Sequence, residues 1–140
     1  MKNRLSRGLR NLNPGNIRVS KTRYKGERSP STDKAFKQFE SIEYGYRAMF
    51  VLLHTYKVRG YCTTIEDIIN RYAPPFENNT SGYISKVCLG TGFDKDFAPD
   101  TLSKEQMIPI VCTMSEVENG VPADYKDVEA GWLLFIADFS

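Results

Sequence analysis

The sequence is poor in the residues that most cofactor and nucleophile chemistry needs. It has one histidine, His54, and three cysteines, Cys62, Cys88 and Cys112, with no C-x-x-C pair. A single histidine makes a His-rich metal site impossible and excludes catalytic schemes that use two or more histidines. No G-x-x-x-x-G-K-[ST] or G-x-G-x-x-G motif occurs, so we expect no metal and no other cofactor. We expect His54 to be a helix-surface or half-buried residue.

Long apolar runs are also missing. No stretch approaches the roughly 20 residues that cross a bilayer, and the N-terminus lacks the apolar segment of a secretory signal. The odd number of unpaired cysteines fits buried thiols in a reducing compartment. We therefore expect synthesis in the cytosol and no membrane insertion, with action elsewhere only after release or as part of a larger particle.

Acidic residues are absent from residues 1–25, which carry many Lys and Arg. A charge run of this kind is usually a solvated surface, and the alternative is a lobe that faces a polyanion. The net charge of the whole chain is only +2, which does not favour a nucleic-acid binder. We expect residues 1–12 to form a basic arm with at most one helical turn.

The composition is that of one ordinary globular domain. Of the 140 residues, 41% are hydrophobic and 26% charged, which is enough to bury a core without disulfides or metals. No repeat, low-complexity tract or linker divides the chain. We expect a single domain over residues 1–140 that is a monomer.

Turn and strand signals come first along the chain. Asn13-Pro14-Gly15-Asn16 predicts a turn, because proline presets a turn backbone and Gly or Asn accepts positive φ. Strands are predicted at 17–19, near 24–25 and between Phe36 and Phe39, with a polar loop over 27–34. These segments predict a small N-terminal sheet of two or three strands.

About five helices are predicted after the sheet, so the expected fold class is α+β, mainly α. Each is marked by a cap and by apolar residues at helical spacing. The expected caps are Ser41, Thr63 or Thr64, Asn79 or Thr80, and Ser103, and a last helix follows Asp124. Pro109 is expected to bend the fourth helix or to delay its start.

Carboxylates are the chemistry that remains. Cleavage of a glycosidic bond needs a carboxylic acid that an apolar setting keeps protonated, usually with a second carboxylate or a fixed water across the sugar. Glu77 follows Pro74-Pro75-Phe76, which are expected to desolvate it, although it also suits the dipole of the next helix. Glu40, at a strand-to-helix junction, and Asp33, in a polar loop, are the other candidates.

Tyrosines and amides supply a second signal. The chain has eight tyrosines, and tyrosine joins a flat apolar face to a hydroxyl, which suits sugar rings. Tyr44, Tyr72, Asn13, Asn16 and Asn79 are the residues that we expect to line a carbohydrate-shaped groove.

Three stretches carry a resemblance to known proteins: RGLRNLNPGNIR (7–18), FKQFESIEYGYRAM (36–49) and TTIEDIINRYAPPFENNTSGYISKV (63–87). In this order they resemble a family of small phage and prophage proteins with a lysozyme-like fold, often described as virion structural or lytic proteins. The chain is more distantly similar to N-acetylglucosaminidases of the flagellar-muramidase type, through 13–18, 36–39 and Tyr72-Ala73. The resemblance implies peptidoglycan (murein) as the substrate, with Asn16, Tyr72 and Tyr83 in the groove.

The sequence departs from this pattern in one respect. In lysozyme-like hydrolases the acid glutamate ends a helix that precedes the small sheet, and here residues 1–12 contain no Glu or Asp. Either another carboxylate replaces it, or the domain binds murein without cutting it. Some phage virion enzymes with this type of fold cut the peptide cross-links instead.

The resulting expectation is a phage or prophage murein hydrolase of the glycoside hydrolase or lytic transglycosylase type. Its predicted catalytic residues are Glu77, Glu40 and Asp33. It requires a groove between the Asn13–Asn16 turn and the Glu77 segment. The alternatives are a non-catalytic murein-binding or virion structural protein, and a murein peptidase. The expected partners are peptidoglycan and other virion proteins, without nucleic acid.

Overall fold

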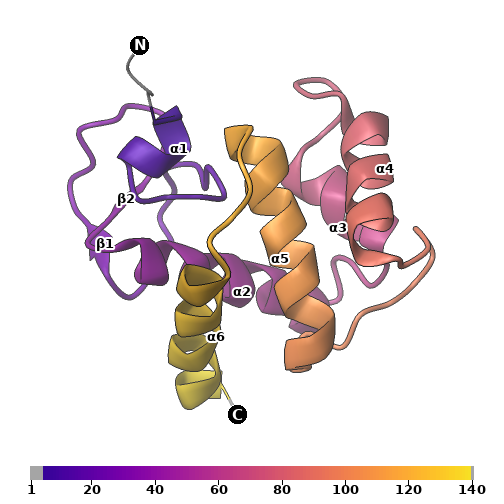
Figure 1. The fold of residues 1–140 in the computed structure, drawn as a ribbon. Helices are drawn as coiled ribbons and strands as arrows, with labels where there is room; N and C mark the ends of the chain where they lie inside the picture. Colours follow the sequence, from indigo (N-terminus) through magenta and orange to yellow (C-terminus); the bar gives the residue numbers. More distant parts are fainter. Residues whose placement is uncertain (1–4, 140) are drawn as a thin grey trace.

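The computed structural model describes residues 5–139 and has a mainly helical α+β fold (Figure 1). Within this range there are six helices and one sheet of two antiparallel strands. The part of the predicted basic arm that is described forms α1 (Arg7–Arg10), a single turn capped by Ser6. The predicted fold class is confirmed.

The sheet has two strands, within the predicted two or three, but its strands lie at other positions than two of those predicted. Strand β1 (Glu27–Arg28) pairs with β2 (Gln38–Phe39), with Glu27 opposite Phe39. The strand predicted over 17–19 is reduced to an isolated bridge between Arg18 and Phe36, and the one predicted near 24–25 lies after Gly26 instead. Both predictions are therefore wrong.

A buried lysine holds the segment between the two predicted strand positions. The Lys37 side chain is completely buried, and its Nζ donates to the carbonyls of Ser20 (3.3 Å) and Thr22 (2.8 Å). The same ammonium contacts the Glu27 carboxylate at 3.0 Å. The backbone over 20–22 therefore curls around a charge that must be solvated by protein groups, and its carbonyls are not free for a sheet.

Helix α2 (Ile42–Val58) is the first long helix and begins at the predicted cap. The Ser41 hydroxyl accepts from the Tyr44 N–H. The stripe predicted for this helix is buried at Met49, Leu53 and Tyr56. The helix packs against the Asn13–Asn16 turn so closely that a Cβ at Gly45 would collide with the backbone of Leu12. Glycine is needed at that close approach.

The remaining helices begin close to the positions that their caps predict. Thr64 and Asp67 form a capping box at α3 (Ile65–Tyr72), Asn79 caps α4 (Thr80–Thr91), and Ser103 caps α5 (Lys104–Asn119). Pro109 lies inside α5 and does not delay its start. The last helix, α6 (Tyr125–Phe139), packs along α2.

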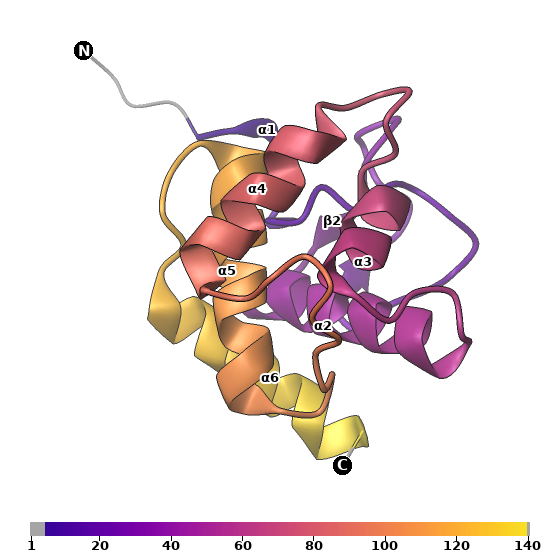
Figure 2. The same ribbon diagram turned by 90° about the vertical axis from the view of Figure 1, so that its right-hand side faces the viewer.

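Helix α5 lies at the centre of the molecule, between the N-terminal segments on one side and α3 with α4 on the other (Figures 1 and 2). Its face is buried from Met107 to Met114. Its C-terminal end contacts α1. Residues more than a hundred positions apart in sequence therefore meet at this end, and the candidate site is built there.

His54 is half-buried on α2, as predicted. Its Nδ1 lies 2.8 Å from Thr101 Oγ1, and its ring packs edge-on against Phe135 and Phe139. Desolvation by these neighbours lowers its pKa below the usual value. It has a packing role and lies outside the groove described next.

Candidate active site

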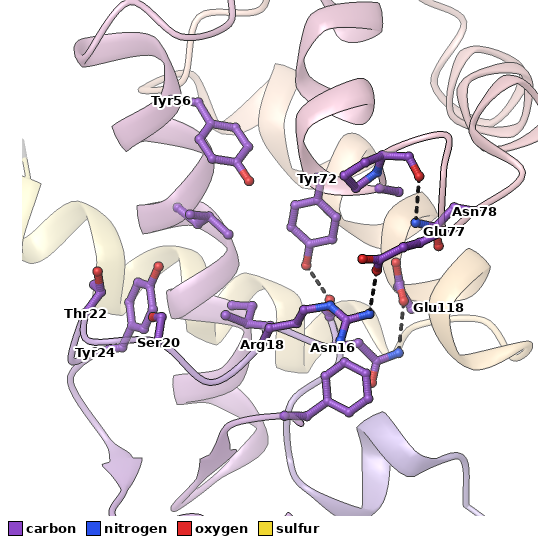
Figure 3. Close-up of a pocket in the computed structure, with 16 residues that line it drawn as sticks. Asn16, Arg18, Ser20, Thr22, Tyr24, Tyr56, Tyr72, Glu77, Asn78 and Glu118 are labelled. Atoms are coloured by element: carbon purple, nitrogen blue, oxygen red, sulfur yellow. Dashed lines mark hydrogen bonds and ion pairs between the residues drawn. The ribbon is translucent and has the colours of Figure 1, made fainter. Parts of the chain in front are cut away.

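A groove of about 340 Å³ lies between the Asn13–Asn16 turn and the segment that follows α3 (Figure 3). One wall comes from Gly15 to Thr22, and the other from Tyr72 to Asn78. Leu52 and Tyr56 of α2 line it, and Glu118 of α5 lies at one end. The predicted groove between the turn and the Glu77 segment is thus present.

The turn that forms one wall is held by Asn13. Its amide nitrogen donates to the carbonyls of Ile17 (3.0 Å) and Lys37 (2.9 Å), and its Oδ1 accepts from the Ile17 N–H at 3.0 Å. The side chain is completely buried. Asn13 therefore shapes the wall and does not face the groove, contrary to the predicted role in binding.

Asn16 follows in a left-handed conformation, with φ of 49°, which asparagine tolerates better than most residues. This conformation directs its side chain at the end of α5, where Nδ2 donates to Glu118 Oε1 at 2.9 Å. Next to it, the Tyr72 hydroxyl donates to the carbonyl of Gly15. Asn16 and Tyr72 therefore line the groove, as expected for binding residues.

Glu118 is the carboxylate that the structure adds to the candidates. It is half-buried in the last turn of α5, and its second oxygen, Oε2, accepts from the Tyr83 hydroxyl at 3.0 Å. Asn119, the next residue, fixes the helix end: its Nδ2 donates to the carbonyl of Pro14 (2.8 Å), and its Oδ1 accepts from Ser6 (2.6 Å). The carboxylate is therefore held in place from both sides of the groove.

The surroundings of Glu118 favour its protonated form. Desolvation raises its pKa, and this outweighs the hydrogen bonds from Asn16 and Tyr83 and the more distant charge of Arg18, which lower it. A carboxylate in the last turn of a helix also opposes the helix dipole. Burial raises the pKa of Tyr83 well above its usual value, so this phenol stays protonated and can donate.

Glu77 lines the same groove in a different setting. Its Oε2 contacts Arg18 at 2.9 Å, and 40% of its side chain is exposed. The desolvation expected from the preceding residues is not present, because Phe76 is 82% exposed. Two carboxylates therefore face one groove. Glu118 is half-buried and hydrogen-bonded to neutral donors, whereas Glu77 is exposed and paired with Arg18.

The other two predicted catalytic carboxylates lie outside the groove. Asp33 accepts two hydrogen bonds from Arg7 (2.7 and 2.8 Å), one from Asn11 and two from backbone N–H groups, and these donors hold its pKa far below the usual range. Glu40 is exposed before α2. Asp33 binds structural donors, and neither carboxylate lines the groove with Glu77.

The groove continues past Glu118 into a second pocket of about 290 Å³. Asn78 and Glu118 line both pockets, and Asn79, Gly82, Tyr83 and Lys86 line the second. The predicted binding residues Asn79 and Tyr83 therefore lie on the far side of Glu118. Tyr44 instead packs under Gly26 and lines neither pocket. Glu118 thus lies where two adjacent cavities meet.

Glu118 was not among the predicted catalytic residues, because the lysozyme-like pattern places the acid before the sheet and the candidate groove pointed to Glu77. The signal was present in the segment S-E-V-E-N-G (115–120), which ends a strongly predicted helix. Acidic residues are unfavourable in the last turn of a helix, so their presence there calls for another role.

The described residues 5–139 hold no cluster of three or more His, Cys, Asp or Glu side chains that would bind a metal ion. Over the same range, none of the helices combines the length and apolar character required to cross a bilayer.

Comparison with known proteins bears on the origin of the chain. No family model matches it. It is similar to Protein P5 of Pseudoalteromonas phage PM2, with 34% identity over 134 residues that cover 93% of this chain and 82% of that protein. A match of this extent includes the end of α5 as well as the turn and the Glu77 segment.

Proposed function

The chain belongs to a family of phage proteins together with Protein P5 of phage PM2, and from this premise we propose that it is a phage murein hydrolase that cleaves the glycan strand. The observation that carries the proposal is Glu118, a carboxylic acid with a raised pKa that lines two adjacent cavities. A polymer can lie through both cavities, with sugars on each side of this acid.

The chemistry follows from the protonation state. Glu118 gives its proton to the glycosidic oxygen as the C–O bond breaks, so that the leaving sugar departs as a neutral alcohol. The resulting carboxylate then takes a proton from the attacking hydroxyl, which restores the acid. Proton transfer of this kind contributes about 10²- to 10⁴-fold to the rate of an enzyme.

The attacking hydroxyl distinguishes two versions of the reaction. If Glu77 orients a water or stabilises the positive sugar, the product has a reducing end, as in a glycoside hydrolase. If the 6-hydroxyl of the muramyl sugar attacks, the product has an anhydro end, as in a lytic transglycosylase. Glu77 lines the same groove and keeps its ion pair with Arg18, so we favour the first version.

The position of Glu118 supports the lysozyme-like comparison. In those hydrolases the acid ends a helix that precedes the small sheet. Here α5 follows the sheet in sequence, but its end contacts α1 and the turn that leads towards the sheet. In this proposal Glu118, from the C-terminal part of the chain, takes the place of the acid that residues 1–12 lack. The absence of Glu and Asp from residues 1–12 is then compatible with catalysis.

The test is the Glu118→Gln variant on purified, dye-labelled murein sacculi. We expect dye release to fall by about 10²-fold or more, because glutamine keeps the size and shape of the side chain but carries no acidic proton. Mass spectrometry of the fragments released by the wild type identifies the bond, since reducing, anhydro and free-peptide ends differ in mass.

Glu40→Gln is the matched control, because Glu40 is an exposed carboxylate outside the groove. It should release dye at the wild-type rate. Sacculus binding by a wild-type protein that releases no dye would support the virion structural or murein-binding alternative. Fragments that carry free-peptide ends and intact glycan would support a peptidase.

A further inference from the structure

Beyond Tyr24 and Tyr56 the groove opens into a third cavity, of about 460 Å³, which we call the arginine pocket. It shares four lining residues with the candidate active site: Thr22, Tyr24, Leu52 and Tyr56. Five basic side chains line it, Arg23, Lys25, Arg47, Arg59 and Arg71, and no acidic residue does. The proposed glycan groove thus leads directly into a cationic recess.

Three of these cations are available to a ligand. Arg23, Arg59 and Arg71 are exposed and form no ion pair with any residue in the range 5–139. Arg71 is also oriented: its guanidinium lies 4.0 Å from the centre of the Tyr61 ring and 5.4 Å from that of Tyr56. A guanidinium stacked on a ring by its face keeps its N–H edge free to bind a planar anion.

Arg47 supplies a second, independent observation. Its side chain is only 8% exposed, and one terminal nitrogen donates to Asp138 at 2.8 Å. Its Nε is buried and has no hydrogen-bond partner within residues 5–139. A buried N–H that lacks an acceptor is costly, so an oxygen acceptor beside Arg47 would be favourable.

We propose that the arginine pocket binds carboxylates of the murein stem peptide, an inference that rests on the proposed function. The stem peptide branches from the muramyl sugars and carries free carboxylates, so a glycan lying in the adjacent groove projects an acidic branch sideways. Planar carboxylates match the fork of arginine, which binds both oxygens at once. The pocket therefore selects glycan that still carries its peptides.

The same chemistry argues against a nucleic acid as the occupant. Single strands bind through bases stacked on free aromatic faces in addition to phosphate contacts. In this pocket Tyr56 is buried, and Arg71 covers the ring of Tyr61. A guanidinium therefore already occupies one face of the Tyr61 ring, and Tyr56 is not available for stacking.

The experiment is titration calorimetry with a soluble disaccharide-tetrapeptide and with the same compound after its carboxylates are converted to amides. We expect the wild type to bind the carboxylate form at least about tenfold more tightly. The Arg59→Ala/Arg71→Ala variant should bind both forms with the same, weaker affinity. Both side chains are exposed, so this variant should keep the fold, which circular dichroism checks.

Arg28→Ala/Lys126→Ala is the matched control, since it removes the same charge from exposed positions that line none of these pockets. It should keep the wild-type preference. Equal affinity of the wild type for both compounds would overturn the proposal, as would a preference that survives in Arg59→Ala/Arg71→Ala. A DNA oligonucleotide that binds more tightly than the muropeptide, and only when both arginines are present, would overturn it in favour of a nucleic acid.

The outcome is separate from that of the proposed function. Cleavage of sacculi without any carboxylate preference would contradict this inference alone. Carboxylate-dependent binding by a wild type that cuts no murein would contradict the proposed hydrolysis and leave the arginine pocket as a recognition site.

Discussion

The loop around Asp33 and the end of α5 around Glu118 both hold a carboxylate among hydrogen-bond donors, yet they shift its pKa in opposite directions. Asp33 has five donor contacts, two of them from the Arg7 guanidinium, and its pKa falls far below the usual range. Glu118 has two neutral donors and is largely desolvated, and its pKa rises.

The difference lies in how fully the charge is compensated. A carboxylate surrounded by cationic and backbone donors is fixed in its ionised form and acts as a structural anchor. A desolvated carboxylate with few donors has a raised pKa, which is the direction that a general acid requires. In this protein the donors around Asp33 come from residues at most 26 positions away. The surroundings of Glu118 join segments more than a hundred residues apart.

The largest expected effect is on catalytic activity, which should depend on Glu118 and not on Asp33. Glu118→Gln should lower turnover of murein by about 10²- to 10⁴-fold and leave a folded protein. Asp33→Asn should leave turnover per folded molecule unchanged and lower the melting temperature, because Arg7 and two N–H groups lose a charged acceptor. Dye release and thermal unfolding of both variants measure this. Equal loss of activity in the two would remove the distinction.

The next effect concerns the buried ion pair beside the groove wall. Lys37→Met should destabilise the fold by about 3–5 kcal/mol, because Glu27 is left as a buried carboxylate without its partner. The double variant Lys37→Met/Glu27→Gln should recover part of that loss. Urea unfolding of the three proteins tests this, and a single variant as stable as the wild type would show that the pair is not coupled to folding.

These contrasts also show what the sequence can and cannot predict. The caps at Ser41, Thr64 and Ser103 were predictable because each acts within one helical turn. The positions of the strands were not predictable, because each strand depends on a partner segment elsewhere in the chain: Arg18 pairs with Phe36, and Glu27 with Phe39. Burial of a lysine on the same strand face as Phe39 cannot be predicted from the local sequence pattern.

The candidate site divides in the same way. Asn16, Tyr72 and Glu77 line the groove and were predicted from their side-chain chemistry: an amide, a ring with a hydroxyl, and a carboxylate. The desolvation predicted for Glu77 was wrong, because Phe76 is exposed. Glu118 was missed because its desolvation comes from the docking of α5 on the turn, which Asn119 and Ser6 determine. Only the conflict of an acid with the helix dipole marked it in the sequence.

A smaller effect is the pH dependence of the free energy of unfolding, which should have opposite signs for Glu118 and Asp33. The pKa of Glu118 is higher in the folded protein than in the unfolded chain, where it is about 4.5. The contribution of Glu118 to the free energy of unfolding is therefore fully present below pH 4.5 and is lost as the pH rises through the folded pKa. Glu118→Gln should therefore gain stability over the wild type as pH rises, by about 1.4 kcal/mol for each unit that separates the two pKa values.

Asp33 should show the opposite sign. Its folded pKa is lowered, so its contribution is present above the unfolded value of about 3.8 and is lost as pH falls below it. Asp33→Asn should approach the wild-type stability only in acid. Unfolding curves of the wild type and both variants from pH 3 to pH 8 measure both trends, and parallel curves for either pair would contradict the assigned shift.

The smallest effect tests the donors of Glu118 one at a time. Tyr83→Phe removes a hydrogen bond of 3.0 Å to the carboxylate, and this bond stabilises the charged form. Its loss should raise the pKa of Glu118 further, so the acid stays protonated to higher pH. A hydrogen bond worth about 1 kcal/mol corresponds to about 0.7 pH unit. The alkaline limb of the kcat/KM profile should move upward by about that amount.

Tyr46→Phe is the control for Tyr83→Phe, because it also removes a buried hydroxyl, one that lies 2.9 Å from Ser115 Oγ and makes no bond to Glu118. It should lower stability by a similar amount and leave the pH profile in place. If Tyr83 had only a structural role, the two variants would behave alike, and neither limb of the kcat/KM pH profile would shift in either variant. A limb that moves only in Tyr83→Phe identifies Glu118 as the group that titrates in the reaction, because no other carboxylate of the described chain receives this hydroxyl.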